Sequence, residues 1–263
     1  MTNLLDSRQA ANSDTPDIPR RQSCSAHTFW ETCISEEDSS RRRFLHLAMG
    51  GTLTSLATAA GVEFATPHPV LAQSKLSPDA ALQELMDGNR RFTSGRLTAP
   101  EQDLAILKQN TIEKQEPFAS VLSCADSRVP VELVFDQSIG HVFVARVAGN
   151  VVTPEIIASL EYGAAVLGTK VILVMGHGNC GAVKATIQAK EAPGQISALY
   201  PHIQPAVDQA GSNPEAATKA NAKIQSALLR EASTVISGLV KEGKLKVVAG
   251  YYDVASGTAS LLD

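Results

Sequence analysis

Aromatic residues are scarce in this sequence, and basic residues do not outnumber acidic ones. Phe, Trp and Tyr make up 5% of the 263 residues, and the formal net charge is -4. A nucleic-acid-binding surface needs positive charge for the phosphates and commonly uses aromatic rings to stack on bases. We therefore expect no nucleic-acid partner.

Cysteine is also rare, and it does not form a pattern typical of disulfide-rich proteins. The four cysteines, Cys24, Cys33, Cys124 and Cys180, are too few and too scattered for a disulfide framework. Beyond the first seventy residues the sequence contains no internal repeat and no low-complexity segment. The hydrophobic content of 44% is sufficient for a core, and the length fits one or two domains.

The first seventy residues resemble a targeting segment more than a folded domain. Residues 1–39 are polar and aperiodic, which is typical of disorder. The basic stretch "SRRRFLH" at 40–46 precedes an uncharged run at 47–62 and small residues at 70–72. This order is typical of a secretory signal, and the paired arginines before Phe-Leu resemble a twin-arginine (Tat) signal. An amphipathic or membrane helix is the alternative, but the run is short and contains Gly and Thr.

We therefore predict a leader and signal peptide over residues 1–72, removed on export, and one domain over residues 73–263. The processed protein is expected in the periplasm, or in a thylakoid lumen if the host has one, without a stable membrane span. A misassigned start codon would explain the long leader. The processed chain keeps Cys124 and Cys180, for which a disulfide and a metal site are the competing uses.

Helical and strand patterns alternate along the rest of the chain. Helices are predicted at 78–92, within 101–114, from a cap at Thr153 to Gly168, from 178 to 190 and over 213–243. Strands are predicted at 119–122, 141–147, 170–177 and from 246, with a turn at Ser256-Gly257 and a fifth edge strand. Such alternation predicts an α/β fold with a mostly parallel sheet of four to five strands flanked by helices. Ligands of these sheets bind beyond the carboxyl ends of the strands.

Two short motifs occupy those strand ends. "SCADSR" follows the strand at 119–122, and "HGNC" follows the strand at 170–177. Cys124, His177 and Cys180 together offer two sulfur atoms and one nitrogen atom, a donor set that suits zinc. Asp126 is placed to supply a fourth ligand or to leave that position to water, and Arg128 is placed to pair with it.

Each motif alone has an ordinary structural interpretation. A buried cysteine is usually a small apolar residue, and Asp-Ser-Arg in a turn is often a cap with an ion pair. The two motifs in this order, each after an apolar strand, are more specific. Together they resemble the β-class carbonic anhydrases over essentially the whole of residues 73–263.

The resemblance implies a catalytic domain with one Zn²⁺ per chain that interconverts carbon dioxide and bicarbonate, its small-molecule substrates. By position, Cys124, His177 and Cys180 would be the zinc ligands, while Asp126 and Arg128 would orient the zinc-bound hydroxide. In a closed state of some members, Asp126 itself would bind the zinc. The resemblance also implies a homodimer or higher homo-oligomer with the pocket at the subunit interface; the predicted substrate-side residues are Gln115, Phe143, Ala148, Tyr162 and Gly181.

This chain departs from the family pattern at several positions. Val147 replaces a common asparagine, which changes the local hydrogen bonds. Val121 and Ser123 stand where a bicarbonate-gated subset has Trp and Gly, so we expect the open subtype with Asp126 off the zinc. Val166 stands where several relatives have a proton-carrying histidine, so the proton path is unassigned.

Other functions remain open from the sequence. A carbonyl sulfide or carbon disulfide hydrolase would use the same zinc site with a different pocket. A non-catalytic bicarbonate-binding scaffold usually lacks a ligand or the Asp-Arg pair, and this chain keeps all five residues. A purely structural zinc site would need four fixed ligands, and a thiol-disulfide protein would need Cys124 and Cys180 to pair with each other.

Overall fold

The computed structural model describes residues 74–99, 111–112, 114–189 and 191–262. The predicted signal peptide lies outside the described residues, as does nearly all of the helix predicted within 101–114.

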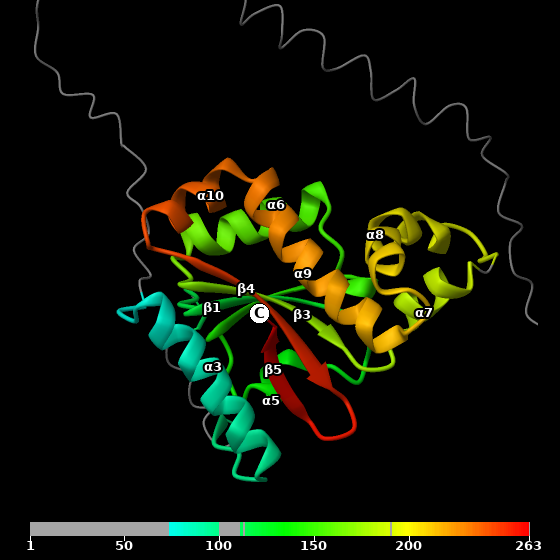
Figure 1. The fold of residues 1–263 in the computed structure, drawn as a ribbon. Coiled ribbons are helices and arrows are strands. Elements are labelled where there is room, and N and C mark those ends of the chain that lie inside the picture. The colour runs from blue at the N-terminus through cyan, green and yellow to red at the C-terminus, as the bar shows by residue number, and fades with distance from the viewer. Residues whose placement is uncertain (1–73, 100–110, 113, 190, 263) are drawn as a thin grey trace, which may run out of the picture. The chain divides into compact units, whose positions relative to one another are not determined.

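A five-stranded sheet forms the centre of this domain, in the order β2-β1-β3-β4-β5 (Figure 1). The strands are β1 (Ala119–Ser123), β2 (Val142–Arg146), β3 (Val171–His177), β4 (Lys246–Asp253) and β5 (Thr258–Leu262). The first four run parallel, and β5 is antiparallel to β4. The predicted α/β fold and the fifth edge strand are thus confirmed.

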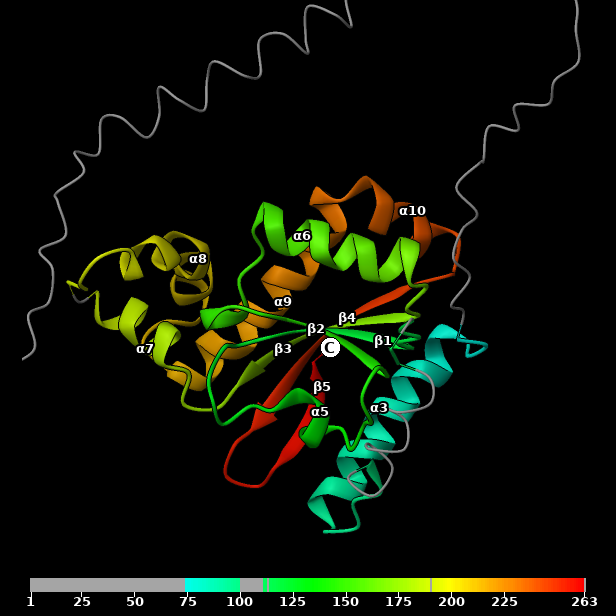
Figure 2. The same ribbon diagram turned by 180° about the vertical axis from the view of Figure 1, so that it is seen from behind.

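Helices cover both faces of the sheet. The helical elements are α3 (Pro78–Thr93), α5 (Val131–Val134), η2 (Ala148–Asn150), α6 (Pro154–Glu161), η3 (Tyr162–Val166), α7 (Gly181–Gln188), η4 (Ile196–Leu199), α8 (Tyr200–Ala210), α9 (Pro214–Ala232) and α10 (Thr234–Lys241). Helices α3 and α5 lie on one face, and α6, α9 and α10 lie on the other, while α7 and α8 lie beside α9 (Figures 1 and 2).

Alternate residues of the strands build the two halves of the core. Val121 and Leu173 pack with Leu85 of α3 and Val134 of α5. The adjacent residues on the same strands, Leu122 and Ile172 among them, point to the other face and pack with α6, α9 and α10. Every residue of β1 and β3 is buried, as expected for central parallel strands with both faces covered.

Several predicted boundaries were wrong. The helix expected over 213–243 is two helices, because Ser233 ends α9 and accepts a hydrogen bond from Ile236 N at the start of α10. Helix α7 begins at Gly181 rather than near Gly178, since the preceding residues form the metal-site turn. Thr153 does not cap α6 by accepting an amide; its hydroxyl instead donates to Glu155 Oε2 at 2.9 Å.

Helix α8 was not predicted; it contains Pro201 near its start and Pro205 in its interior, where proline is unfavourable. The helix expected between Thr153 and Gly168 is α-helical only to Glu161 and then continues as the π-helical turn η3. No helix in the described ranges is both long and apolar enough to cross a membrane.

The strand register aligns the ends of the strands from which the site residues follow. Ser123 at the end of β1 pairs with Arg146 of β2 and with Met175 of β3. Residues that follow Ser123 and Met175 are therefore brought to the same edge of the sheet, although about fifty positions separate them in the sequence.

Candidate metal centre

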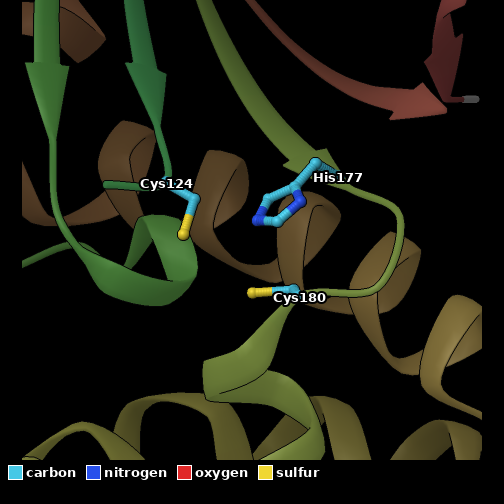
Figure 3. A group of neighbouring side chains, drawn as sticks. All are labelled: Cys124, His177 and Cys180. Atoms are coloured by element: carbon cyan, nitrogen blue, oxygen red, sulfur yellow. The ribbon is translucent and has the colours of Figure 1, made fainter. Parts of the chain in front are cut away.

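Two neighbouring strands deliver three potential metal ligands to this edge. Cys124 directly follows β1, His177 is the last residue of β3, and Cys180 precedes α7 after a short turn. Figure 3 shows the two sulfur atoms and the imidazole ring pointing toward one another. Their ligand atoms all lie within 4.8 Å of one another.

All three side chains are withdrawn from solvent: 4% of Cys124, 0% of His177 and 1% of Cys180 is exposed. His177 Nδ1 lies 3.0 Å from the carbonyl oxygen of Gly178, which fixes the ring and favours a proton on Nδ1. Nε2 is buried and, within the described part of the chain, has no hydrogen-bond partner. A buried nitrogen without a partner is costly, and metal coordination removes that cost.

The thiols of Cys124 and Cys180 shift each other's pKa values in opposite directions. A hydrogen bond from Cys180 is the main cause that lowers the pKa of Cys124 to about 4, against the opposing effect of burial. The same interaction, together with burial, raises the pKa of Cys180. The metal-free pair therefore shares one proton, and this proton must leave before both sulfurs bind a cation. Two thiolates and an imidazole at this separation fit zinc.

Asp126 and Arg128 form a two-pronged ion pair beside the cluster. Arg128 Nε donates to Asp126 Oδ1 at 2.9 Å, and Arg128 Nη2 donates to Oδ2 at 2.7 Å. These hydrogen bonds hold the pKa of the Asp126 carboxyl well below its usual range, so the group is ionised at neutral pH. Asp126 Oδ2 lies 3.9 Å from His177 Nε2, which places the carboxylate at the edge of the metal centre.

The turn between His177 and Cys180 is hydrogen-bonded to this ion pair. Asn179 adopts a left-handed backbone conformation with φ 58°, which asparagine tolerates better than most residues. Its carbonyl accepts a hydrogen bond from Arg128 Nη2 at 3.2 Å, and its side-chain Oδ1 accepts one from Lys184 Nζ at 2.9 Å. The turn and the Asp-Arg pair therefore support each other.

Arg146 supports the other side of the site. At the end of β2, its Nε donates to the carbonyl of Cys124 at 3.0 Å and its Nη2 to the carbonyl of Asp126 at 2.6 Å. These contacts hold the backbone of "SCADSR". Sequence reasoning assigned no role to Arg146, Asn179 or Lys184, although an asparagine between two predicted ligands was a signal for a tight turn.

The predicted substrate-side residues fall into two groups. Gly181 and Ala148 lie near the metal centre: Gly181 directly follows Cys180, and Ala148 precedes Gly149, whose amide donates to Cys124 Sγ at 3.3 Å. Gln115 and Tyr162 instead line a cavity of about 650 Å³ at the amino ends of the strands. The ring of Phe143 packs on that of Tyr162 with centroids 6.3 Å apart.

This second group does not reach the metal centre of its own chain. Phe143 pairs with Ser120, which is four residues before Cys124 on the same strand. At about 3.3 Å per residue this amounts to roughly 13 Å along the strand. Gln115 lies farther still from Cys124, before β1 begins. Gln115 and Tyr162 line one cavity and Phe143 packs on Tyr162, so the five predicted substrate-side residues are divided between the two ends of the sheet.

Val147 occupies the position of the asparagine that is common in the family pattern. Its amide donates to the carbonyl of Ser123, and its carbonyl accepts from the amide of Asn150. The side chain packs against two apolar clusters, one of which contains Cys124 and Cys180. The substitution thus puts an apolar wall where a polar group was expected.

Comparison with known proteins agrees with the geometry of the site. A family model described as carbonic anhydrase matches residues 119–259. A carbonic anhydrase of Mycolicibacterium smegmatis is 35% identical over 193 residues, which cover 70% of this chain and 93% of that protein.

Solved structures share the fold. A β-carbonic anhydrase of the fungal pathogen Aspergillus fumigatus is 25% identical, with a TM-score of 0.56 over 70% of this chain and 90% of that one. A tetrameric β-carbonic anhydrase of Sordaria macrospora, at 21% identity and a TM-score of 0.54, covers 60% of this chain and 89% of its own, and shows likeness of fold alone. Since the family match spans more than half of the sequence and includes both ligand motifs, the chain belongs to the β-class carbonic anhydrase family.

Proposed function

We propose that this protein is a zinc enzyme that hydrates carbon dioxide reversibly to bicarbonate and a proton. The observation that carries the proposal is the meeting of Cys124, His177 and Cys180 within 4.8 Å, next to an intact Asp126–Arg128 pair. A structural zinc site would not need an ionised carboxylate held beside the metal by a guanidinium group.

The two cysteines and the histidine would hold the ion. When bound, Zn²⁺ lowers the pKa of a coordinated water from about 15.7 to roughly 7 and so supplies hydroxide at neutral pH. Asp126 would accept a hydrogen bond from the nucleophile and direct its lone pair toward carbon dioxide. Arg128 would keep Asp126 ionised and off the metal, which corresponds to the open subtype.

The substrate side of the pocket is proposed to come from two chains. Ala148 and Gly181 lie beside the ligands of their own chain, whereas Gln115 and Tyr162 line a cavity at the other end of the sheet, with Phe143 packed on Tyr162. A second copy that apposes this cavity to the metal centre would bring Gln115 to the substrate, where its amide would stabilise developing negative charge. Phe143 and Tyr162 would form an apolar wall for carbon dioxide.

The exposed apolar side chains around this cavity favour such an assembly. Ile112 is 82% exposed, Tyr162 48% and Val166 45%, and all three line the cavity. Grouped apolar residues of this kind often mark an interface between copies. The Sordaria relative is tetrameric, which supports a homodimer or a higher homo-oligomer for this chain as well.

We also propose export by the twin-arginine route, with residues 1–72 removed and the enzyme of residues 73–263 acting in the periplasm or in a thylakoid lumen. The order of basic, apolar and small residues supports this assignment. Mass spectrometry of the protein secreted by its host would identify Gln73 as the first residue. A first residue upstream of Ser40 would contradict the assignment.

The function is tested by metal analysis and stopped-flow carbon dioxide hydration on protein purified without added zinc. One zinc per chain with fast hydration that rises with pH is expected. One zinc per chain with turnover of carbonyl sulfide or carbon disulfide instead would assign the sulfur substrates. Zinc without either activity would favour a bicarbonate-binding scaffold, and oxidised Cys124 and Cys180 without zinc would overturn the metal centre itself.

A further inference from the structure

Gly149 joins a metal ligand to a helix that carries no ligand. Its amide donates a hydrogen bond to Cys124 Sγ at 3.3 Å, and its carbonyl accepts one from Asn221 Nδ2 of α9 at 2.8 Å. Gly149 has φ 75°, a conformation that favours glycine, and a β-carbon there would lie 2.7 Å from Ile203 Cδ1. The turn η2 is therefore held between the sulfur atom and α9.

A second amide fixes the orientation of the first. Gln225, one helical turn after Asn221, donates from Nε2 to Asn221 Oδ1 at 3.2 Å and to the carbonyl of His202 at 3.0 Å. Its Oε1 accepts from the amide of Val152 at 2.7 Å. A backbone carbonyl only accepts and a backbone amide only donates, so the Gln225 side chain has one orientation. Asn221 must then turn its Nδ2 toward Gly149.

Both amides are deeply buried: 0% of Asn221 and 1% of Gln225 is exposed. Buried amides are costly unless they are fully hydrogen-bonded, and leucine would satisfy the packing of α9 without that requirement. The hydrogen bonds of this pair to other elements go to Gly149 and Val152, just beyond β2, and to α8. The network thus ties the turn beside Cys124 to two helices.

We propose that Asn221, oriented by Gln225, is a positioning residue of the metal centre that holds the Gly149 amide against the Cys124 sulfur. The amide hydrogen bond stabilises the thiolate form of Cys124 and fixes the position of its sulfur, so its loss should weaken zinc binding while leaving the sulfur richer in electrons. The inference rests on the metal centre of the proposed function, although not on the reaction. Loss of such outer partners typically weakens metal binding by roughly 10- to 100-fold.

The test compares Asn221→Leu with Ser226→Ala. Leucine is close in size and removes the donor to Gly149. Ser226 is a matched control, because it is buried on the same helix and its hydroxyl donates to the carbonyl of Lys223 within that helix. We expect the zinc dissociation constant of Asn221→Leu, measured by chelator competition, to rise about tenfold or more over that of the control.

Cobalt-substituted protein provides a readout that a merely structural role would not move. A thiolate that has lost its amide hydrogen bond is richer in electrons, so the sulfur-to-cobalt charge-transfer band of Asn221→Leu should move to longer wavelength. An unmoved band and a zinc affinity equal to that of Ser226→Ala would overturn the proposal. If the wild type binds zinc but does not hydrate carbon dioxide, the reaction assignment fails, whereas these two readouts still decide the role of Asn221.

A measurement on the wild type covers the case in which Asn221→Leu does not fold. In protein loaded with an NMR-active cadmium isotope, a hydrogen bond to a ligand sulfur transmits scalar coupling from the metal to the amide proton. We expect that coupling at the Gly149 amide. Its absence in the folded, cadmium-loaded protein would show that this amide does not bond to the ligand and would overturn the proposal.

Discussion

The two ends of the parallel sheet differ in how complete a site one chain provides. At the carboxyl ends, Cys124, His177 and Cys180 are buried and lie within bonding reach of one cation. At the amino ends, Gln115 is exposed, and Tyr162 is 48% exposed beside a cavity whose described lining residues include no Cys, His, Asp or Glu.

This difference follows from topology. The parallel pairing and register of β1 and β3 bring their carboxyl ends together within one chain, so the ligands need no second copy. Gln115, Phe143 and Tyr162 lie apart from the metal centre of their own chain, so we infer that their role in the reaction depends on assembly with a second copy. Changes at the carboxyl end should therefore act through the metal, and changes at the amino end should act through the substrate.

The largest effect is expected from the loss of a ligand. Cys180→Ala removes one of three donors, so zinc binding should weaken by more than the roughly 100-fold that an outer partner costs, and hydration should fall to background. Metal analysis after dialysis and stopped-flow rates measure both, with Ser226→Ala as the control. Full zinc content in Cys180→Ala would show that the ion is held elsewhere.

Arg128→Ala should separate metal binding from turnover. Without the guanidinium group, Asp126 is free to move onto the zinc, since its Oδ2 already lies 3.9 Å from His177 Nε2. We expect zinc content to be retained and hydration to fall roughly 1,000-fold, the scale of a lost positioned catalytic group. Arg128→Lys is the matched charge control, because lysine cannot form the two-pronged contact. If Arg128→Ala loses its zinc, the role of Arg128 is structural.

Gln115→Ala should reduce hydration roughly 100-fold with unchanged zinc content, as expected for loss of one donor to developing charge. Mixing it with the zinc-free Cys180→Ala protein sharpens the comparison between the two ends. In a dimer of one chain of each kind, the intact metal centre would receive Gln115 from its partner. Random mixing should then restore about a quarter of the wild-type rate. No recovery in verified mixed dimers would place both groups in the same chain.

The smallest effect is the pH dependence of zinc binding. The pKa of Cys124 is lowered to about 4, so this thiol is already ionised near neutral pH, whereas the pKa of Cys180 is raised and its proton must be displaced. Lower pH favours that proton and so weakens binding. We expect the apparent zinc affinity to fall about tenfold as the pH decreases from 8 to 7. Competition titrations at several pH values measure the slope, and a flat profile would contradict the shared-proton arrangement.

Much of the carboxyl-end site could be predicted because its information is local. "SCADSR" and "HGNC" each follow an apolar strand, and parallel strands end at one edge of the sheet. Helix α8 carries two prolines that obscure its helical pattern, and no element was predicted there. The break at Ser233 was missed because helical patterns continue on both sides of it.

The parts that could not be predicted depend on contacts between distant positions. Asn221 lies 72 residues from Gly149, and within α9 it resembles an ordinary polar helix residue. Its burial becomes evident only when α9 packs beside η2. Gln115, Phe143 and Tyr162 were singled out by resemblance, since nothing in their local sequence marks them, and the single chain leaves them apart from the metal centre.

X-ray absorption at the zinc edge of the purified protein tests the metal centre most directly. The account predicts two sulfur neighbours at about 2.3 Å, from Cys124 and Cys180, with one imidazole nitrogen and one further light atom at about 2.0 to 2.1 Å. A shell without sulfur, or with a single sulfur neighbour, would contradict the assignment of this strand edge as the catalytic metal centre.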